Sequence, residues 1–235
     1  EEKPIVPPVK VETTKDDGKW RLLVDGQELN DKGAACNNFY AEAADFGANV
    51  VRPYGVSDKI KDTLEAAQEK GLYVNFGLYI KRETDGFDYN NAAAVKAQFD
   101  EMKATVERFK DHPALLVWSI GNEAEASYTN LKLCDAINDI AKMIHETDSN
   151  HPTTTTLASS NVNHIINIIE KAPHIDILSV NTYAPNLPGV LGNLQSAGWT
   201  KPYMITEFGP RGTWQMNPEP ERVLPWGGLV EQTSS

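Results

Sequence analysis

The sequence is poor in cysteine, in basic charge and in long apolar runs. Only two of its 235 residues are cysteines, Cys36 and Cys134, and their wide separation fits no metal-ligand spacing. We therefore expect packing residues or free thiols rather than a disulfide. No apolar run reaches the length of a transmembrane helix, so we expect no membrane partner. An excess of 33 acidic over 22 basic residues, a net charge of −11, disfavours a nucleic-acid partner.

The amino-terminal stretch EEKPIVPPVKVE is polar, contains three prolines and shows neither a helical nor a strand period. It also lacks the pattern of a signal peptide, so it is typical of a linker or of a trimmed mature start. We expect residues 1–17 to form an extended linker before a single domain over residues 18–235. A secreted or periplasmic location is the corresponding expectation.

Strand and helix patterns alternate along most of the chain. Asp25-Gly26 predicts a hairpin turn, and helical patterns lie between the later apolar segments. This alternation is typical of βαβ units with a parallel sheet, and its sevenfold repetition favours a (β/α)₈ TIM barrel over an open sheet. The seven expected core strands are 33–37, with GAACNN read as a short buried strand, 49–53, 72–80, 114–121, 153–158, 176–183 and 202–208.

The residues after Pro210 show no pattern of a strand or of a complete helix. An eighth strand and its helix are therefore missing from the expected order. We predict an α/β fold, a TIM barrel that lacks its last strand and helix unit in this chain and is incomplete at its carboxyl terminus.

Polar residues gather where the predicted strands end, which is the face that carries the chemistry in parallel barrels. Arg52 ends the second strand, Asn122 and Glu123 end the fourth, Tyr183 ends the sixth and Glu207 lies in the seventh. The two glutamates are 84 residues apart in sequence and three strands apart around the barrel. They could therefore face each other across its mouth.

Two facing carboxylates in unlike surroundings are the basic equipment of glycoside hydrolysis: one donates a proton to the leaving oxygen and the other attacks the anomeric carbon. Arg52 would keep Glu207 ionised, and Tyr183 could donate a hydrogen bond to the same carboxylate. Asn122 could hold a sugar hydroxyl. Aromatic residues expected near this face suit the apolar faces of sugar rings: Tyr54, Tyr79, Tyr183, Trp199 and Trp214.

The segment HPALLVWSIGNE resembles the acid/base motif of clan A glycoside hydrolases, and its form is closest to the barrel domain of glycoside hydrolase family 2. GANVVRPYG resembles the second strand of that family, and KPYMITEFG resembles its nucleophile strand. NDKGAACNN is similar to the first strand after the entry hairpin. The resemblance covers roughly residues 20–215 in the family order.

The resemblance implies that Glu123 is the acid/base and Glu207 the nucleophile of a retaining double displacement. It also implies that Arg52, Asn122 and Tyr183 support them, that the substrate is a carbohydrate, and that no metal or organic cofactor takes part. Family members carry β-sandwich domains before the barrel, so such domains, or self-association, could cover the open barrel. The loops lack the histidine-rich segments of β-galactosidases, so the sugar cannot be transferred from the family.

Several candidates also have ordinary structural readings. Arg52 could pair with a neighbouring acid, residues 181–183 could form a turn, and Trp214 could anchor a loop instead of a sugar. Glu125 is interpreted as a solvated acid. So are the acids of one loop, Glu83, Asp85 and Asp88. The five histidines are placed at helix ends and at the amino-terminal approaches to strands, away from the chemistry: His112, His145, His151, His164 and His174.

The sequence leaves two possible functions. The first is a retaining β-glycoside hydrolase, or a transglycosidase of the same fold. The second is a non-catalytic carbohydrate-binding remnant, which the missing last strand motivates, because an open barrel exposes sheet edges and apolar surface.

Overall fold

Seven parallel strands form the centre of the molecule, paired in the order β10-β9-β8-β7-β6-β5-β4. The computed structural model describes residues 7–53, 60–183, 186–209, 222–223 and 229–230. The order in space follows the order in the chain, as expected when each strand is joined to its parallel neighbour by a crossover connection. These strands are β4 (Gly33–Ala35), β5 (Val50–Arg52), β6 (Tyr73–Leu78), β7 (Leu115–Asn122), β8 (Thr153–Leu157), β9 (Ile177–Tyr183) and β10 (Tyr203–Gly209).

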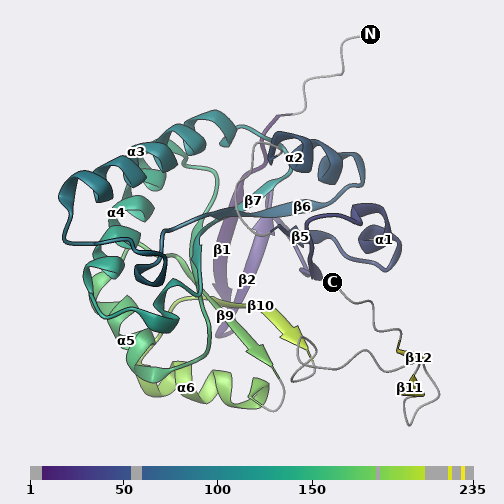
Figure 1. Cartoon of the computed structure of the whole chain (residues 1–235). Helices are drawn as coiled ribbons and strands as arrows, with labels where there is room; N and C mark the ends of the chain where they lie inside the picture. The colour runs from purple at the N-terminus through teal and green to yellow at the C-terminus, as the bar shows by residue number, and fades with distance from the viewer. Residues whose placement is uncertain (1–6, 54–59, 184–185, 210–221, 224–228, 231–235) are drawn as a thin grey trace.

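The helices form an arc around the strands, open between α6 and α1 (Figure 1). The nearly closed barrel of alternating strands and helices confirms the predicted TIM-barrel fold. The helices are α1 (Tyr40–Asp45), α2 (Ile60–Glu69), α3 (Ala92–Phe109), α4 (Lys132–Thr147), α5 (Val162–Lys171) and α6 (Val190–Ala197). Short 3₁₀ turns are η1 (Glu83–Asp85), η2 (Ala124–Ser127) and η3 (Leu187–Gly189). None of the described helices has both the length and the apolar character needed to span a membrane.

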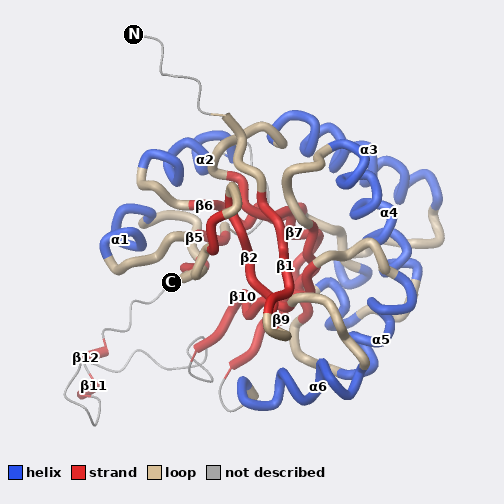
Figure 2. The backbone as a smooth tube through the Cα atoms, turned by 180° about the vertical axis from the view of Figure 1, so that it is seen from behind, coloured by secondary structure: helices blue, strands red, loops and turns tan. Residues whose placement is uncertain are grey.

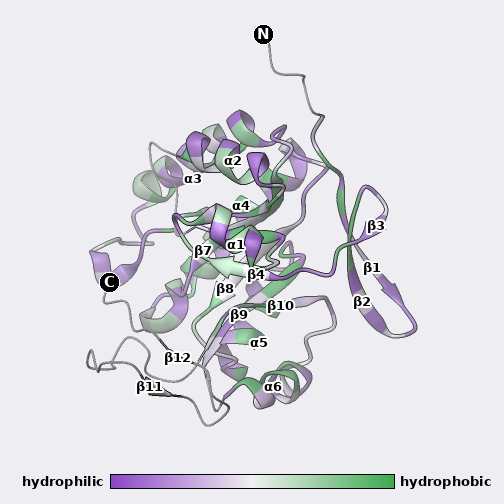
Figure 3. Ribbon diagram, turned by 90° about the vertical axis from the view of Figure 1, so that its right-hand side faces the viewer, coloured by the Kyte–Doolittle hydropathy of each residue, from purple (hydrophilic) through white to green (hydrophobic). Residues whose placement is uncertain are grey.

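The main core lies between the strands and this arc, where the central strands are mostly hydrophobic (Figure 3). Trp118 on β7 is fully buried, and its ring centroid lies 4.8 Å from that of Phe76. Its Nε1 donates a hydrogen bond of 2.8 Å to Asp148, so the one polar atom of the indole is satisfied. These contacts hold β7 against β6 and against the loop that precedes β8.

A small antiparallel sheet of β1 (Val11–Asp16), β2 (Lys19–Val24) and β3 (Gln27–Glu28) crosses in front of the barrel strands in Figure 2. The predicted turn at Asp25-Gly26 joins β2 to β3. Val11, Leu22 and Val24 pack in a second apolar cluster with barrel residues that include Val50 and Ile177. The hairpin therefore covers the amino-terminal end of the barrel and leaves the carboxyl ends of the strands for a site.

The strand β1 corrects the expectation of a linker without strand pattern at residues 11–16. Each of its six residues pairs with β2, from Val11 with Val24 to Asp16 with Lys19. The backbone nitrogen of Val11 also donates a 2.7 Å hydrogen bond to the carbonyl of Asn150. This strand is held by its partners rather than by an apolar pattern of its own, which is why the sequence did not indicate it. The division into a linker and a barrel domain stays a prediction.

The barrel sheet has two edges, β4 and β10, which lie near each other without backbone pairing. A cavity of about 430 Å³ lies at this seam, lined by β4 residues and by Ile205, Glu207 and Phe208 of β10. The expectation that β4 is buried is wrong, since Gly33 and Ala35 are exposed. No strand of the described residues covers its outer edge.

Beyond Pro210, the structure describes two short strands, β11 (Arg222–Val223) and β12 (Leu229–Val230), which pair with each other. The expectation of no strand in this region is therefore wrong at these residues. They form a separate two-stranded sheet and do not extend the barrel.

Candidate active site

The backbone bends sharply at the carboxyl end of β7. Its pairing with β8 shifts register between Ser119 and Asn122, and both Gly121 (φ 77°) and Glu123 (φ 52°) adopt left-handed backbone conformations. A side chain at position 121 would place a Cβ atom 2.8 Å from a methyl carbon of Ile80, so glycine is required there. The bulge turns the next two side chains, Asn122 and Glu123, toward the same neighbour on β9.

A second register shift lies in β10, between Ile205 and Glu207. Consecutive residues of a regular strand point to opposite faces of the sheet. Here Thr206 and Glu207 both contact residues of the site: the Thr206 hydroxyl donates to Asn181 over 2.9 Å, and Glu207 accepts from Arg52. The bulge therefore explains how this strand directs two successive polar side chains to one place.

A continuous network of hydrogen bonds joins the two glutamates. Arg52 donates 2.6 Å hydrogen bonds to both Glu207 and Asn122. Asn181 then donates to Asn122 over 3.2 Å and to Glu123 over 2.7 Å. Arg52 is 7% exposed and Asn181 is fully buried, so both hold their geometry away from bulk water. Glu123 and Glu207 thus belong to one cluster at one end of the barrel.

Tyr183 adds a further contact to Glu207, because its hydroxyl donates a 2.7 Å hydrogen bond to the second carboxylate oxygen. Each oxygen of Glu207 therefore has its own donor, Arg52 on one side and Tyr183 on the other. The side chain of Glu207 is only 12% exposed. Such an arrangement fixes the direction of the carboxylate.

Two polar atoms of the network are left for other partners. Among the described residues, no acceptor lies within hydrogen-bond distance of Nδ2 of Asn122, and no donor reaches Oε2 of Glu123. Asn122 also lines a cavity of about 260 Å³ that extends between the ends of β5, β6 and β7. Glu123 itself lies beside this cavity without lining it. A ligand in the cavity could therefore bind the Asn122 amide next to Glu123.

The structure brings together five of the six predicted site residues: Arg52, Asn122, Glu123, Tyr183 and Glu207. Their catalytic roles stay predictions. The sixth, Trp214, lies outside the described residues, as does the aromatic residue Tyr54.

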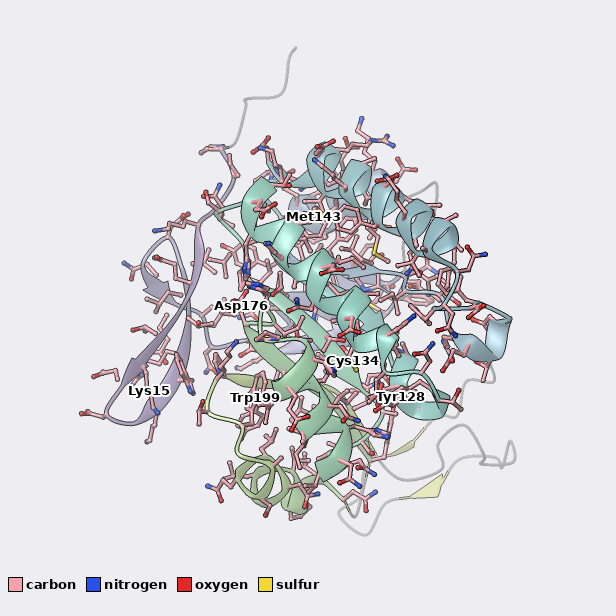
Figure 4. The ribbon with its side chains drawn as sticks, turned by 90° about the vertical axis from the view of Figure 1, so that its left-hand side faces the viewer. Lys15, Tyr128, Cys134, Met143, Asp176 and Trp199 are labelled. Atoms are coloured by element: carbon pink, nitrogen blue, oxygen red, sulfur yellow. The ribbon has the colours of Figure 1, made fainter. Side chains whose placement is uncertain are left out.

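Trp199 is not at the site. It precedes β10, its indole donates to the carbonyl of Pro202 over 3.0 Å, and it packs against the main core. Figure 4 shows Trp199 toward the hairpin that carries Lys15, and Tyr128 toward the opposite end. The prediction of an aromatic residue at the catalytic end is therefore wrong for Trp199, because this residue lies between α6 and the start of β10 and does not follow a strand.

Glu125 is buried, not solvated as predicted, with 5% of its surface exposed. Its carboxylate accepts a 2.6 Å hydrogen bond from the backbone nitrogen of Ala158, which follows β8. Burial raises the pKa of Glu125 to about 7, and the charge of Glu123 adds to the rise. The carboxylate thus holds the turn after Glu123 against the next strand.

His164 lies in the first turn of α5, with Nδ1 3.8 Å from Glu125. The prediction that it lies at the amino-terminal face is wrong, because α5 starts at the carboxyl end of β8. The other histidines precede strands or end a helix, as predicted. His145 pairs with Asp176, and His151 pairs with Asp148.

The acidic loop after β6 is only partly solvated. Glu83 accepts hydrogen bonds from the backbone nitrogens of Thr129 (2.5 Å) and Asn130 (3.2 Å), so it ties this loop to the one before α4. Asp85 accepts the Tyr79 hydroxyl over 2.7 Å, and Asp88 binds the backbone of Asn90.

The two cysteines are free thiols, and neither lies in the network. Burial raises the pKa of Cys36 above its ordinary value and that of Cys134 to about 11. Both thiols are therefore protonated at neutral pH and poor nucleophiles. This agrees with the expectation of packing residues.

Asn181 is the residue that the sequence left unassigned. The sequence places it at the end of the sixth strand, as part of either a site or a turn. In the structure its amide makes three hydrogen bonds, to Asn122, Glu123 and Thr206. Its position at a strand end was the available signal, but the contacts depend on the register of three strands.

Residues 62–215, more than half of the chain, match the family model described as glycosyl hydrolases family 2, TIM barrel domain. The chain belongs to glycosyl hydrolase family 2. In this family 2 chain, the glutamates near the carboxyl ends of β7 and β10 are joined by the hydrogen-bond network of Arg52 and Asn181. No curated protein matches it.

Solved structures show the same fold at low sequence identity. A family 2 β-galacturonidase from Eisenbergiella tayi bound to galacturonate shares 18% identity with a TM-score of 0.65. A β-D-glucuronidase from Dictyoglomus thermophilum shares 16% identity with a TM-score of 0.64. A β-mannanase from the blue mussel Mytilus edulis shares 15% identity with a TM-score of 0.63.

The covered lengths differ between these structures. The family 2 chain aligns over 86%, 87% and 85% of its own length with the three enzymes. It spans only 38% of the galacturonidase and 39% of the glucuronidase, but 82% of the mannanase. At these identities the likeness shows the fold.

Proposed function

We propose that the chain hydrolyses β-glycosides with retention of configuration, in two steps. In the first, Glu207 attacks the anomeric carbon and forms a glycosyl ester, while Glu123 gives its proton to the departing oxygen. In the second, Glu123 takes a proton from water, which attacks the anomeric carbon and releases the sugar and the Glu207 carboxylate. Family membership supports glycoside hydrolysis in general.

The observation that carries this proposal is the unequal bonding of the two carboxylates. Both oxygens of Glu207 accept hydrogen bonds, one from a guanidinium and one from a phenol, which suits an ionised nucleophile. Glu123 accepts one bond from a neutral amide and keeps Oε2 for the leaving group. The free amide of Asn122 would bind a hydroxyl of the sugar between them.

The test is covalent labelling with a panel of 2-deoxy-2-fluoro β-glycosides that carry an activated leaving group, followed by peptide mass spectrometry. We expect a glycosyl adduct on Glu207. Glu207→Gln should lose the adduct and lower turnover by about 10³-fold or more. Glu123→Gln should lose activity on poor leaving groups and keep more of it on activated aryl glycosides, which need little protonation. Glu170→Gln, on the exposed face of α5, serves as the control.

Normal turnover by Glu207→Gln would refute the assignment. Reversible glycan binding without an adduct on any residue would instead support a carbohydrate-binding role without cleavage. Products longer than the substrate would indicate transglycosylation. A secreted or periplasmic location, and partner domains or self-association at the seam between β4 and β10, remain predictions.

A further inference from the structure

Arg82 brings a positive charge to the cavity beside the network, and it has no acidic partner among the residues that the structure describes. It follows β6 and lines the 260 Å³ cavity together with Tyr79 and Asn122. Its Nε atom is buried and donates to no partner. In the described part of the chain, no carboxylate lies within 4.0 Å of its guanidinium. An unpaired buried donor is costly, so a ligand that supplied an acceptor there would bind favourably.

The acids next to Arg82 in sequence are held by other donors. Glu83 accepts from the backbone nitrogens of Thr129 and Asn130, and Asp85 accepts from the hydroxyl of Tyr79. The charge of Arg82 is therefore not neutralised within its own loop. This contrasts with the chain as a whole, in which acidic residues outnumber basic ones by 33 to 22.

The other arginine of the cavity is already bound. Arg52 donates to Glu207 and to Asn122, both at 2.6 Å, so its charge is already paired with a carboxylate. Asn122 lines the same cavity as Arg82 and directly precedes Glu123. A sugar bound by the Asn122 amide would therefore be the sugar whose bond is cleaved, and Arg82 would border that same sugar.

We infer that Arg82 binds an acidic substituent, a carboxylate or a sulfate ester, on the sugar at the cleaved bond. The inference rests on the proposed function for the role of this sugar, but the contact itself requires no turnover. A guanidinium binds either anion through two parallel hydrogen bonds, and in doing so Nε would gain the acceptor that it lacks. The substrate class is then β-glycosides of acidic sugars.

The test measures binding by the unmodified chain with calorimetry or ligand-observed NMR. The probes are methyl β-glucuronide, methyl β-galacturonide, methyl β-glucoside 6-sulfate, methyl β-galactoside 6-sulfate and the two neutral methyl glycosides. We expect at least one acidic probe to bind about tenfold or more tightly than its neutral counterpart. Arg82→Gln should abolish this preference, and Arg82→Lys should keep part of it. Arg108→Gln, an exposed arginine of α3, should leave it unchanged.

The acidic probe that binds distinguishes a carboxylate site from a sulfate site. Equal binding of acidic and neutral probes, or a preference that survives in a folded Arg82→Gln protein, would overturn the inference. Labelling of Glu207 reports separately on the proposed function. Labelling without an Arg82-dependent preference would keep the hydrolase and refute the acidic subsite, whereas the reverse result would keep the subsite and refute the nucleophile.

Discussion

Asn181 donates a 2.7 Å hydrogen bond from its amide to the carboxylate of Glu123. The same nitrogen lies 3.2 Å from the side-chain oxygen of Asn122, and the amide oxygen is held by Thr206. A single buried amide from the sixth barrel strand therefore positions two consecutive residues of the fourth. This relationship makes Asn181 a positioning residue for the proposed acid/base.

Replacing Asn181 with alanine should lower kcat on glycosides with poor leaving groups by about 10- to 100-fold, since a hydrogen bond to a charged group contributes about 1.5–3 kcal/mol. Activated aryl glycosides should lose less, because they need less protonation. The ratio of the two losses is measured by steady-state kinetics. Asn193→Ala on α6, which removes a contact with Ser160, is the control. Equal losses on both substrate types would contradict a role through Glu123.

Arg52→Lys should reduce kcat/KM by about 100-fold or more, although the positive charge is kept. A lysine ammonium lacks the planar fork that reaches Glu207 and Asn122 together. The rate of labelling by a fluoro-sugar is the direct measurement, because it reports on the attack by Glu207. Arg108→Lys on α3 should react at the normal rate. Normal labelling of Arg52→Lys would show that the charge alone is sufficient.

Gly121→Ala tests the bend before Asn122. The added methyl would meet Ile80 at 2.8 Å in a backbone with φ 77°. Gly47→Ala, at φ 85° with no atom within 4 Å of its added Cβ, isolates the backbone cost alone. Urea unfolding should show Gly121→Ala to be less stable than Gly47→Ala by about 1–3 kcal/mol. Activity should fall only in Gly121→Ala, and equal behaviour of the two proteins would contradict the steric argument.

Glu125 should make the chain less stable as the pH rises from about 4.5 to 8. Its folded-state pKa is about 7, above the ordinary value of 4.5, so in this range the folded state binds more protons than the unfolded state. Glu125→Gln can still accept from Ala158 but carries no charge. Urea unfolding across this range should show a free energy of unfolding that depends less on pH, by about 2–3 kcal/mol in total.

The comparison with Glu125→Gln also separates the pH dependence of stability that Glu125 contributes from the part that His164 contributes. Burial lowers the pKa of His164 from its ordinary value of 6.5, which gives the opposite trend, a loss of stability as the pH falls below that value. Because both proteins contain His164, the difference between their pH profiles belongs to Glu125. Parallel profiles for the two proteins would contradict a buried titrating carboxylate.

The sequence was sufficient for the barrel and for the location of the two glutamates. A strand of apolar residues that runs into Asn122 and Glu123 can only deliver them to one end of a parallel barrel. The same logic brought Arg52, Tyr183 and Glu207 to that end. These predictions of location depend on local pattern and on chain order alone, and the structure confirms them.

Contacts that depend on strand register could not be predicted from the sequence. Glu125 looks like a loop acid until η2 folds back against the end of β8, where Ala158 binds it. Asn181 becomes important only because bulges in β7 and β10 turn extra side chains toward it. Arg82 becomes a candidate binding residue only because its acidic neighbours, Glu83 and Asp85, accept hydrogen bonds from other groups. Each case requires knowledge of which strands lie side by side and at what offset.

The irregularity in β10 also makes this strand sensitive to its length. Thr206 and Glu207 both face the network only because one extra residue interrupts the alternation. Because Ile205 pairs with Val180 and Glu207 with Asn181, loss of the Thr206 codon would restore the regular alternation, leave Glu207 opposite Asn181 and remove the hydroxyl that holds the Asn181 amide oxygen. In a one-residue deletion scan along 203–209, loss of Thr206 should therefore be the deletion that labelling of Glu207 by a fluoro-sugar tolerates best.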